Sequence, residues 1–239
     1  MINDRTLGTG TFITLGAPVV TEIISMMGYD WLLLDMEHGC ITEGDLLHNL
    51  QAMRPGPKAI VRVREPNPTL ISRVLDAGAH GIMVPHVSSA EQAKAIVDAM
   101  YYAPKGSRGY STSVRAMQFG MNPVNDTVNW EAPLLLAQIE NREGVEAAQE
   151  IAAVPGVDML FVGPRDLSLD LSVRPDPMDF NLALELVAKA AQAEGKQAGI
   201  LVRNLSEIDK LKSLGYTALA IGSDLAALRN GYKPFIIER

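Results

Sequence analysis

Strand-like and helix-like segments alternate from one end of this chain to the other. Short, nearly uninterrupted apolar runs are typical of strands buried on both faces, as in a parallel sheet. The clearest run is Trp-Leu-Leu-Leu at residues 31–34. On this pattern we expect eight strands, at Thr11–Ala17, Trp31–Glu37, Lys58–Arg64, Gly81–Val87, Leu134–Glu140, Met159–Val162, Gln197–Val202 and Ala218–Ile221.

A helix is expected after each strand. Pro18 near a first turn and Gly28 just past a last turn mark the two ends of the first helix. The expected helices cover Pro18–Met27, Glu43–Met53, Pro68–Ala77, Ala90–Tyr101, Glu143–Ala153, Asn181–Glu194, Ser206–Leu214 and Leu225–Arg229. A long irregular stretch from Ala103 to Trp130 interrupts the alternation, and a Pro-rich excursion follows the sixth strand. Loops of such length are usually functional or mobile.

Eight strand–helix units in 239 residues predict an α/β protein of the (β/α)8 barrel class, a TIM barrel. No linker or change of composition divides the chain, so we expect one domain over residues 1–239. The rival fold is an open, doubly wound sheet. Gly8-Thr9-Gly10 is only a weak dinucleotide-binding signal, because the third glycine is missing and the pair precedes the first strand.

Composition narrows the classes of function. The chain is 47% hydrophobic and 21% charged, which is enough to bury a sizeable core. A net charge of −7 argues against a nucleic-acid partner. The single cysteine, Cys40, excludes an internal disulfide framework and a multi-cysteine zinc site. With no signal-like N-terminus and no apolar run of membrane-spanning length, we expect a cytoplasmic protein.

Ionisable residues gather where the second expected strand ends. Asp35, Glu37 and His38 directly follow the apolar run. Such groups are costly beside a core unless they are paired or used in chemistry. In a (β/α)8 barrel, active sites lie at the C-terminal ends of the strands. We therefore expect a site at this end of the barrel.

Other strand ends add polar groups to the same place. Side chains alternate along a strand, so Arg62 and Arg64 share one face of the third strand, and Gln138 and Glu140 share one face of the fifth. The remaining strand ends read Pro85-His86, Gly163-Pro164-Arg165-Asp166, Arg203 and Gly222-Ser223. Acids, two arginines and a histidine converging at one mouth predict a site for an anionic, metal-bound substrate.

Glu140 and Asp166 are the candidate metal ligands. They lie at the ends of neighbouring strands in the chain order. Two carboxylates, completed by water and substrate oxygens, make the hard oxygen site typical of Mg²⁺ or Mn²⁺. The chain has no His/Cys spacing for structural zinc.

Each candidate also has a purely structural interpretation. Aspartate is a preferred N-cap residue, so one interpretation makes Asp166 only the N-cap of a short helix beginning at Leu167. A structural interpretation of Glu140 is an ion pair with Arg62 across the mouth of the barrel. The sequence is equally consistent with a satisfied His38 held by Asp35, a structural His86, solvated Arg64 and Arg108, and an inert Cys40.

The motifs resemble those of the HpcH/HpaI family of class II, metal-dependent pyruvate aldolases, and the similarity runs in order over nearly the whole chain. The motifs are Asp35-Met-Glu-His38, Val61-Arg62-Val63, Leu75-Asp76-Ala-Gly78, Val84-Pro85, Gln138-Ile-Glu140 and Phe161-Val-Gly-Pro-Arg-Asp-Leu-Ser168. The Gln-Ile-Glu and Gly-Pro-X-Asp-Leu-Ser pair at this separation is the most specific part.

The resemblance implies a barrel with a divalent metal, Mg²⁺ or Mn²⁺ with Co²⁺ as a further candidate, on the residues matching Glu140 and Asp166. It implies a metal-bound pyruvate enolate with Arg62 beside the enolate oxygen. It also implies that His38, oriented by Asp35, acts as the acid/base. The implied substrate-binding residues are Arg62, Gln138, Gly163, Pro164, Arg165 and Asp166. Family members are typically hexameric, so a homo-oligomer is expected.

Asp76 resembles a family residue that reaches a neighbouring subunit's active site. The helix that carries it starts near the catalytic face and ends at the opposite face, so Asp76 is far from its own strand ends. An acid at a helix C-terminus is poorly placed for the helix dipole. Either Asp76 is a solvated helix-end aspartate, or it approaches the Asp35–His38 region or the acceptor pocket of another protomer.

The sequence departs from the family pattern at three places. Gly39-Cys40 follows the histidine where many members have Ala-Pro, Arg165 stands where a small residue is common, and Arg64 replaces a frequent proline. These changes fall on the acceptor side or the pyruvate pocket and not on the expected metal ligands.

Three functions remain open. The first is a class II aldolase that cleaves a 4-hydroxy-2-oxo acid into pyruvate, or a close 2-oxo acid, and an aldehyde. The second keeps the enolate but joins or splits an acyl-CoA or citrate-like acid, with Arg64, Arg165 and the Lys105–Arg108 loop serving the second partner. The third is a non-catalytic barrel that binds a 2-oxo acid.

Overall fold

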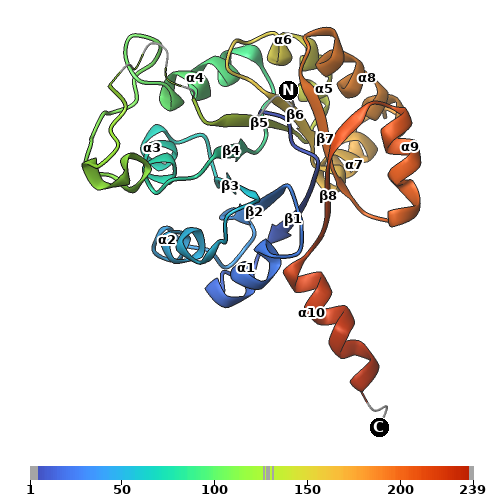
Figure 1. Cartoon of the computed structure of the whole chain (residues 1–239). Coiled ribbons are helices and arrows are strands. Elements are labelled where there is room, and N and C mark those ends of the chain that lie inside the picture. The colour runs from blue at the N-terminus through green and yellow to red at the C-terminus, as the bar shows by residue number, and fades with distance from the viewer. Residues whose placement is uncertain (1–4, 126, 128–129, 131, 237–239) are drawn as a thin grey trace.

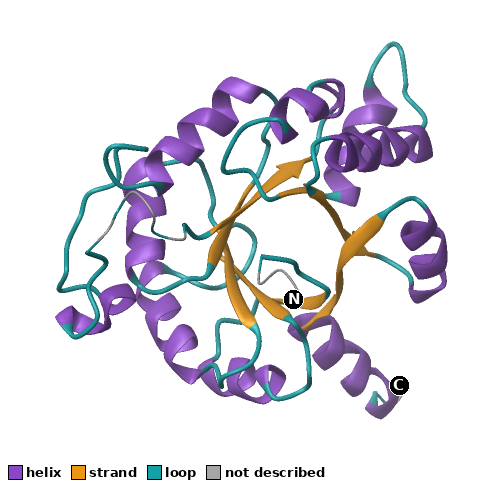
Figure 2. Ribbon diagram, turned by 45° about the horizontal axis from the view of Figure 1, so that its top comes forward, coloured by secondary structure: helices purple, strands orange, loops and turns teal. Residues whose placement is uncertain are grey.

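A computed structural model describes residues 5–125, 127, 130 and 132–236. Eight parallel strands close into a barrel in chain order, and helices surround the ring (Figures 1 and 2). The predicted (β/α)8 fold is confirmed. The strands are β1 Thr9–Ile13, β2 Trp31–Asp35, β3 Lys58–Arg62, β4 Gly81–Val84, β5 Leu134–Ile139, β6 Met159–Val162, β7 Gln197–Val202 and β8 Tyr216–Ser223.

The helices follow the strands as expected, with additions. They are α1 Pro18–Ser25, α2 Glu43–Ala52, α3 Pro68–Asp76, α4 Ala90–Met100, α5 Arg142–Glu146, α6 Ala148–Ala152, α7 Pro164–Val173, α8 Phe180–Ala193, α9 Ile208–Ser213 and α10 Asp224–Tyr232. Three short 3₁₀ helices are η1 Arg115–Gly120, η2 Leu205–Glu207 and η3 Lys233–Phe235. None of the helices described in the structure has the length and apolar character to cross a membrane.

Alternation along the strands divides the apolar side chains into two layers. On β2, Leu33 belongs to the cluster inside the barrel, whereas Leu32 and Leu34 belong to the cluster between strands and helices. The interior cluster also holds Trp31 and Phe161, whose rings meet edge to face at 6.1 Å. Side chains alternate along a strand with a period of two residues. The inward-facing positions that lie beyond this cluster on each strand therefore point into the mouth of the barrel.

Local sequence signals explain the helix boundaries. Thr42 and Asp45 form a capping box that starts α2. Gly28 and Gly78 lie just beyond α1 and α3 with φ of 85° and 95°, a left-handed conformation that glycine adopts readily and that ends helices. These are the glycines that mark the ends of the two expected helices.

Several boundaries differ from expectation. β1 begins two residues early and ends at Ile13, and β2 to β5 end one to three residues sooner than expected, because the chain turns into loops there. The helix expected at Glu143–Ala153 is two short helices that meet at Ala147, where ψ is 5°. The Pro-rich excursion contains a full helix, α7, where the sequence offered only a short helix beginning at Leu167 as one interpretation.

The last helix leaves the ring. α10 follows β8 and extends away from the barrel, so that its C-terminal end lies far from the strands (Figure 1). Leu225, Leu228 and Tyr232 on α10, and Phe235 just after it, are 47–78% exposed. An apolar surface of this kind is characteristic of a contact with another protein chain.

Candidate active site

A buried ion-pair group lies where β2 and β3 end. The Arg62 Nε donates to Asp35 Oδ1 at 2.9 Å, and its Nη2 donates to Oδ2 at 2.8 Å. Arg62 Nη1 lies 2.9 Å from Glu37 Oε2. The guanidinium also lies 5.3 Å from the ring centroid of Phe12, on β1. Asp35 and Arg62 therefore fix each other's orientation through a bidentate contact, the strongest form of this pair.

The surroundings keep Arg62 charged. Burial by itself lowers the pKa of Arg62, but the hydrogen bond to Asp35 and the charges of Asp35, Glu37 and Glu140 outweigh burial and raise it. The interpretation in which Arg62 pairs directly with Glu140 differs from the observed geometry, because its hydrogen-bond partner is Asp35 and its second ion-pair partner is Glu37.

A second buried group lies at the end of β5. Gln138 Nε2 donates to Glu140 Oε1, as expected for two residues on one strand face. Glu140 Oε2 accepts the backbone N–H of His86 at 3.2 Å and lies 3.5 Å from His86 Nδ1. Gly163, at the end of β6, has to be glycine here, because a Cβ at that position would lie 2.2 Å from Glu140 Oε1.

Glu140 is placed where a carboxylate is hard to ionise. Its side chain is 2% exposed. Burial raises the pKa of Glu140, and the charges of Glu37 and Asp166 raise it further, whereas the charge and backbone hydrogen bond of His86 lower it. A bound cation would reverse this penalty, because a positive charge beside the carboxylate favours its ionised form.

Asp166 lies on α7, not at its cap. The helix begins at Pro164 with Gly163 as the N-cap residue, which places Asp166 in the first turn. The interpretation that made Asp166 the cap of a helix starting at Leu167 is wrong, because the helix starts three residues earlier. Asp166 is exposed to solvent, as is Arg165 beside it.

These residues fit a divalent metal of the Mg²⁺ type. Among the residues that the structure describes, no group of three or more His, Cys, Asp or Glu side chains forms a complete ligand set. Two carboxylates from neighbouring strand ends leave the other positions to water and substrate oxygens, which is the common arrangement for Mg²⁺. Gln138 Oε1 is buried without a hydrogen-bond partner. This unpaired acceptor beside Glu140 is what a cation or a metal-bound water would satisfy.

His38 lies at the rim of the site. Its side chain is 66% exposed, and its Nε2 lies 3.8 Å from Glu37 Oε2. Asp35 Oδ1 accepts hydrogen bonds from Arg62 and from the backbone N–H of His38, the latter at 3.3 Å. In the described part of the chain, no hydrogen bond joins Asp35 to the His38 ring, so the acid/base role of His38 stays a prediction. Cys40 is exposed, as an unpaired thiol.

Sequence reasoning placed His86 at a strand end without predicting its contact with Glu140, and it missed Phe12. His86 contacts Glu140 because its backbone adopts a left-handed φ of 53°, which turns the residue after β4 toward the mouth. Phe12 supports the Arg62 guanidinium through its ring. A single φ value produces no periodic pattern in the sequence. The position of His86 at a strand end, next to a proline, was the signal that the sequence offered for this residue.

Asp76 lies at the other end of the molecule. It is the last residue of α3, and its Oδ1 accepts a hydrogen bond from Arg108 Nη2 at 2.7 Å within the same chain. The side chain of Arg108 is 1% exposed, and its guanidinium lies 4.7 Å from the ring centroid of Tyr102. The interpretation of Asp76 and Arg108 as solvated residues is therefore wrong, because they pair with each other. Whether Asp76 also approaches a second protomer stays a prediction.

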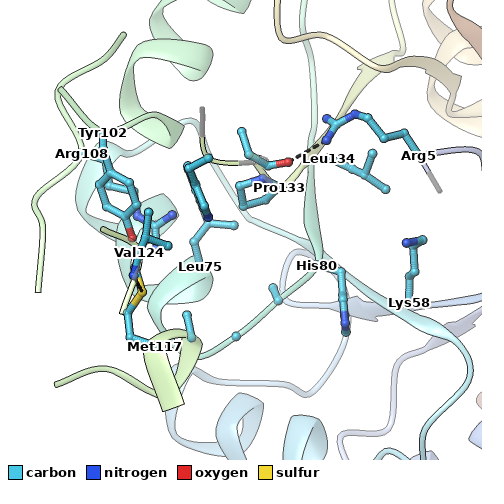
Figure 3. A pocket seen from close by; sticks show the side chains of 15 residues that line it. Arg5, Lys58, Leu75, His80, Tyr102, Arg108, Met117, Val124, Pro133 and Leu134 are labelled. Atoms are coloured by element: carbon cyan, nitrogen blue, oxygen red, sulfur yellow. Dashed lines mark hydrogen bonds between the residues drawn. The ribbon is translucent and has the colours of Figure 1, made fainter. Parts of the chain in front are cut away.

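A cavity of about 340 Å³ adjoins Arg108, also at the N-terminal end of the barrel (Figure 3). Lys58, His80, Pro133 and Leu134, which line it, lie at or just before the first residues of β3 to β5. The Lys105–Arg108 loop is thus on the face opposite the strand ends that carry Glu140. Within one chain, this loop cannot serve a second substrate at that mouth.

Known proteins share this sequence and architecture. A family model described as HpcH/HpaI aldolase/citrate lyase matches residues 8–231. A 2-dehydro-3,6-dideoxy-6-sulfogluconate aldolase of Pseudomonas putida is 36% identical over 95% of this chain and 91% of its own length. A 5-keto-4-deoxy-D-glucarate aldolase of Salmonella gallinarum is 35% identical over 92% of this chain and 87% of its own. A solved structure named citrate synthase SbnG superposes with a TM-score of 0.82 at 30% identity, covering 98% of this chain and 93% of that one.

Proposed function

This chain belongs to the HpcH/HpaI aldolase/citrate lyase family, and we propose that it is a class II aldolase that cleaves a 4-hydroxy-2-oxo acid into pyruvate, or a close 2-oxo acid, and an aldehyde. The resemblance in the sequence motifs is thereby confirmed. One observation carries the proposal: the buried Glu140 carboxylate, close to Glu37 and Asp166, shares the mouth of the barrel with a positive Arg62 held by Asp35.

Glu140 and Asp166 would hold the divalent metal, Mg²⁺ or Mn²⁺, with Co²⁺ as a further candidate. When bound, a divalent ion supplies Lewis-acid stabilisation of negative charge on a 2-oxo acid. Gly163 leaves room for the Glu140 carboxylate, and Gln138 holds it in place. The N-terminus of α7, with Pro164, Arg165 and Asp166, would face the carboxylate of the 2-oxo acid, because helix N-termini favour anions.

Cleavage requires a proton to leave the 4-hydroxyl group. His38 would accept that proton, directly or through one water, as the C3–C4 bond breaks and its electron pair moves onto C3 to give the enolate. The aldehyde then departs, and protonation of C3 completes pyruvate. Arg62 would donate toward the enolate oxygen, since a guanidinium has five N–H groups and its fixed orientation needs no rearrangement as charge develops.

The citrate-like function has a structural neighbour in the citrate synthase. Two features favour the aldolase instead. The Pseudomonas and Salmonella relatives, which match over most of the chain, are aldolases. Within one chain, the basic Lys105–Arg108 loop lies at the end of the barrel opposite this mouth, with Arg108 buried. Within one protomer, the acyl-CoA reaction would therefore lack the basic contact that this loop was expected to give.

We further propose a homo-oligomer, a hexamer by family resemblance, located in the cytoplasm. The exposed apolar residues of α10 support the assembly, and the single cysteine fits the compartment. In such an assembly Asp76 would approach the mouth of another protomer. The chain is proposed to form one functional domain over residues 1–239.

Proton NMR of pyruvate in D₂O tests the proposed function. Protein with Mg²⁺ or Mn²⁺ should exchange the methyl protons for deuterium, and a chelator should stop the exchange, because enolisation needs the metal. Absence of exchange with every divalent metal tried would contradict the aldolase. Consumption of an acyl-CoA together with a 2-oxo acid, while aldehydes are left untouched, would favour the citrate-like function.

A further inference from the structure

Asp170 joins the two segments that carry the proposed metal ligands. It lies on α7, about one helical turn after Asp166. Its Oδ2 accepts a hydrogen bond from the backbone N–H of Arg142 at 2.8 Å. Arg142 is the second residue after Glu140 and the first residue of α5. The contact therefore ties the helix of one candidate ligand to the segment that follows the other.

The backbone N–H of Arg142 needs an acceptor from outside its own helix. The first amides of an α-helix have no intrahelical partner, and Arg142 opens α5. Asn141, the N-cap residue, accepts the N–H of Gly144 at 2.8 Å. Asp170 completes this first turn from a different helix, α7. The start of α5 is thus fixed to α7 by a hydrogen bond that spans 28 positions of sequence.

The Asp170 carboxylate is itself held in one orientation. Arg174 Nε donates to its Oδ2 and Arg174 Nη2 donates to its Oδ1, both at 3.0 Å. Burial raises the pKa of Asp170, but the hydrogen bonds from Arg174 and from the Arg142 backbone outweigh burial and lower it. The contact with Arg142 is therefore made by an ionised carboxylate, which forms shorter and stronger hydrogen bonds than a neutral acceptor.

Other contacts hold the end of β5 on its opposite side. Glu140 Oε2 accepts the backbone N–H of His86, and Asn141 Nδ2 donates to Ser88 Oγ at 2.8 Å. His86 and Ser88 follow β4. The contact with Asp170 lies on the side of α7, where Asp166 is placed. These contacts thus orient Glu140 relative to β4, whereas Asp170 relates its segment to the second candidate ligand.

We propose that Asp170 is a positioning residue that sets the placement of Glu140 relative to Asp166 and thereby the geometry of the metal site. The inference rests on the metal ligands of the proposed function, and it adds a residue that acts through them. Mg²⁺ demands near-ideal octahedral geometry with oxygens at about 2.0–2.1 Å, whereas Ca²⁺ accepts flexible geometry at about 2.3–2.6 Å. Loss of the contact should therefore weaken Mg²⁺ binding more than Ca²⁺ binding.

The metal affinities of Asp170→Ala test the positioning role. Electron paramagnetic resonance measures Mn²⁺ binding, and displacement of Mn²⁺ measures the binding of Mg²⁺ and Ca²⁺. The Kd for Mg²⁺ should rise about tenfold or more, as when an outer partner of a metal ligand is lost. The Kd for Ca²⁺ should rise less than about threefold, since its coordination tolerates displaced ligands. Asp170→Asn should recover part of the Mg²⁺ affinity, because its carbonyl oxygen can still accept the Arg142 N–H.

Substitutions of Arg142 break the same contact from the other side. Arg142→Pro deletes the N–H that Asp170 accepts. Proline is favoured at the first helical position, and Asn141 before it, with φ −144° and ψ 169°, is extended as a following proline requires. Arg142→Pro should reproduce the Mg²⁺ loss of Asp170→Ala. Arg142→Ala is the matched control: it removes the same side chain, which pairs with the exposed acids Glu146 and Asp176, and keeps the N–H. Its affinities should stay within about twofold of wild type.

The outcomes separate this inference from the proposed function. The expected affinities without metal-dependent deuterium exchange of pyruvate would contradict the aldolase and support the positioning role. Wild-type Mn²⁺ affinity in Glu140→Gln would overturn the metal site and the role of Asp170 together. Wild-type Mg²⁺ affinity in Asp170→Ala or Arg142→Pro, equal losses for Mg²⁺ and Ca²⁺, or an equally large loss in Arg142→Ala would overturn the positioning role alone. If circular dichroism shows that Asp170→Ala is unfolded, the two Arg142 variants decide by the same criteria.

Discussion

At the scale of single residues, the site depends on carboxylates that contribute little to the core. Glu140 is almost fully buried, yet it belongs to neither apolar cluster. Its neighbours Glu37 and Asp166 add negative charge. A buried carboxylate without a counter-charge destabilises the folded protein. A bound cation would offset that cost.

Glu140→Gln and Asp166→Asn should each weaken Mn²⁺ binding by roughly 100-fold or more, since even the outer partners of metal ligands change affinity by about 10–100-fold. The melting temperature without metal should stay close to that of wild type. Mn²⁺ titration followed by electron paramagnetic resonance measures the first effect, and circular dichroism measures the second. A variant with wild-type metal affinity would show that its residue is not a ligand.

His38→Ala should separate proton transfer from binding. Cleavage should slow by about 10²–10⁴-fold, the usual contribution of a general base. Binding of oxalate, a pyruvate analogue without a 4-hydroxyl group, should weaken only a few-fold, because His38 is proposed to act on the proton that moves. His48→Ala, which changes an exposed histidine on α2, is the control. Equal losses in cleavage and oxalate binding would instead assign His38 a structural or binding role.

The sequence predicted much of the site because strand periodicity governs it. Alternation placed Arg62, Gln138 and Glu140 on inward faces, and the structure brings them to one mouth. Alternation could not predict which acid pairs with Arg62, because Asp35, Glu37 and Glu140 all act on it at the same mouth. The contact of His86 with Glu140 depends on an unusual backbone angle, so no pattern of apolar and polar residues predicts it.

At the scale of elements, strand cores were the easiest to predict. The bounds of β6 and β7 agree with expectation, and the other strands overlap their apolar runs. The start and length of α7 were missed because Pro164 was read as part of an irregular segment, although proline is favoured at the first helical position. This helix matters, since it carries both Arg165 and Asp166.

Ion pairs tie α7 to α5. Arg174, just after α7, donates to both carboxylate oxygens of Glu143 at 2.7 and 2.6 Å, and to Asp170 at 3.0 Å. The hydrogen bond from Arg174 lowers the pKa of Glu143. A carboxyl group whose pKa is lowered by folding stabilises the folded state above its unfolded pKa, and this stabilisation is lost as pH falls through the folded pKa.

Arg174→Gln should therefore lower the melting temperature slightly at pH 7 and have less effect below about pH 4, where glutamate is becoming protonated in the unfolded chain. The change should be small because the pair is exposed to solvent. Thermal melts of wild type and variant from about pH 3 to 8 measure it, with Lys189→Gln as a control for an exposed ion pair within one helix. A difference that grows toward low pH would contradict this linkage.

At the scale of the whole molecule, the count of strand–helix units was enough to predict barrel closure. Each unit needs a neighbour to cover its apolar faces, and eight parallel units satisfy this in a ring. The direction of α10 was not predictable, because its exposed apolar residues are consistent with packing on its own barrel or on another chain.

Leu228→Asp should reduce the mass of the assembly without unfolding the barrel. Leu228 is 47% exposed on α10, and a charge there would be costly inside an interface but not in solvent. Light scattering after size exclusion gives the mass, and circular dichroism reports the fold. Leu186→Asp, at a similarly exposed leucine on α8, is the control. An unchanged mass for Leu228→Asp would exclude α10 from the interface at this residue.

The groups proposed for metal and proton chemistry come from β2 to β6 and the residues that follow them, whereas β7 and β8 close the ring without adding a proposed metal ligand. Mutations on these two sides of the mouth are therefore separable in their effects. The segment between β7 and α9, at residues 203–207, can be varied to recruit new aldehydes while the reactive groups stay untouched. The barrel is thus a good starting scaffold for directed evolution, and libraries confined to that segment should retain pyruvate exchange more often than libraries at residues 35–38.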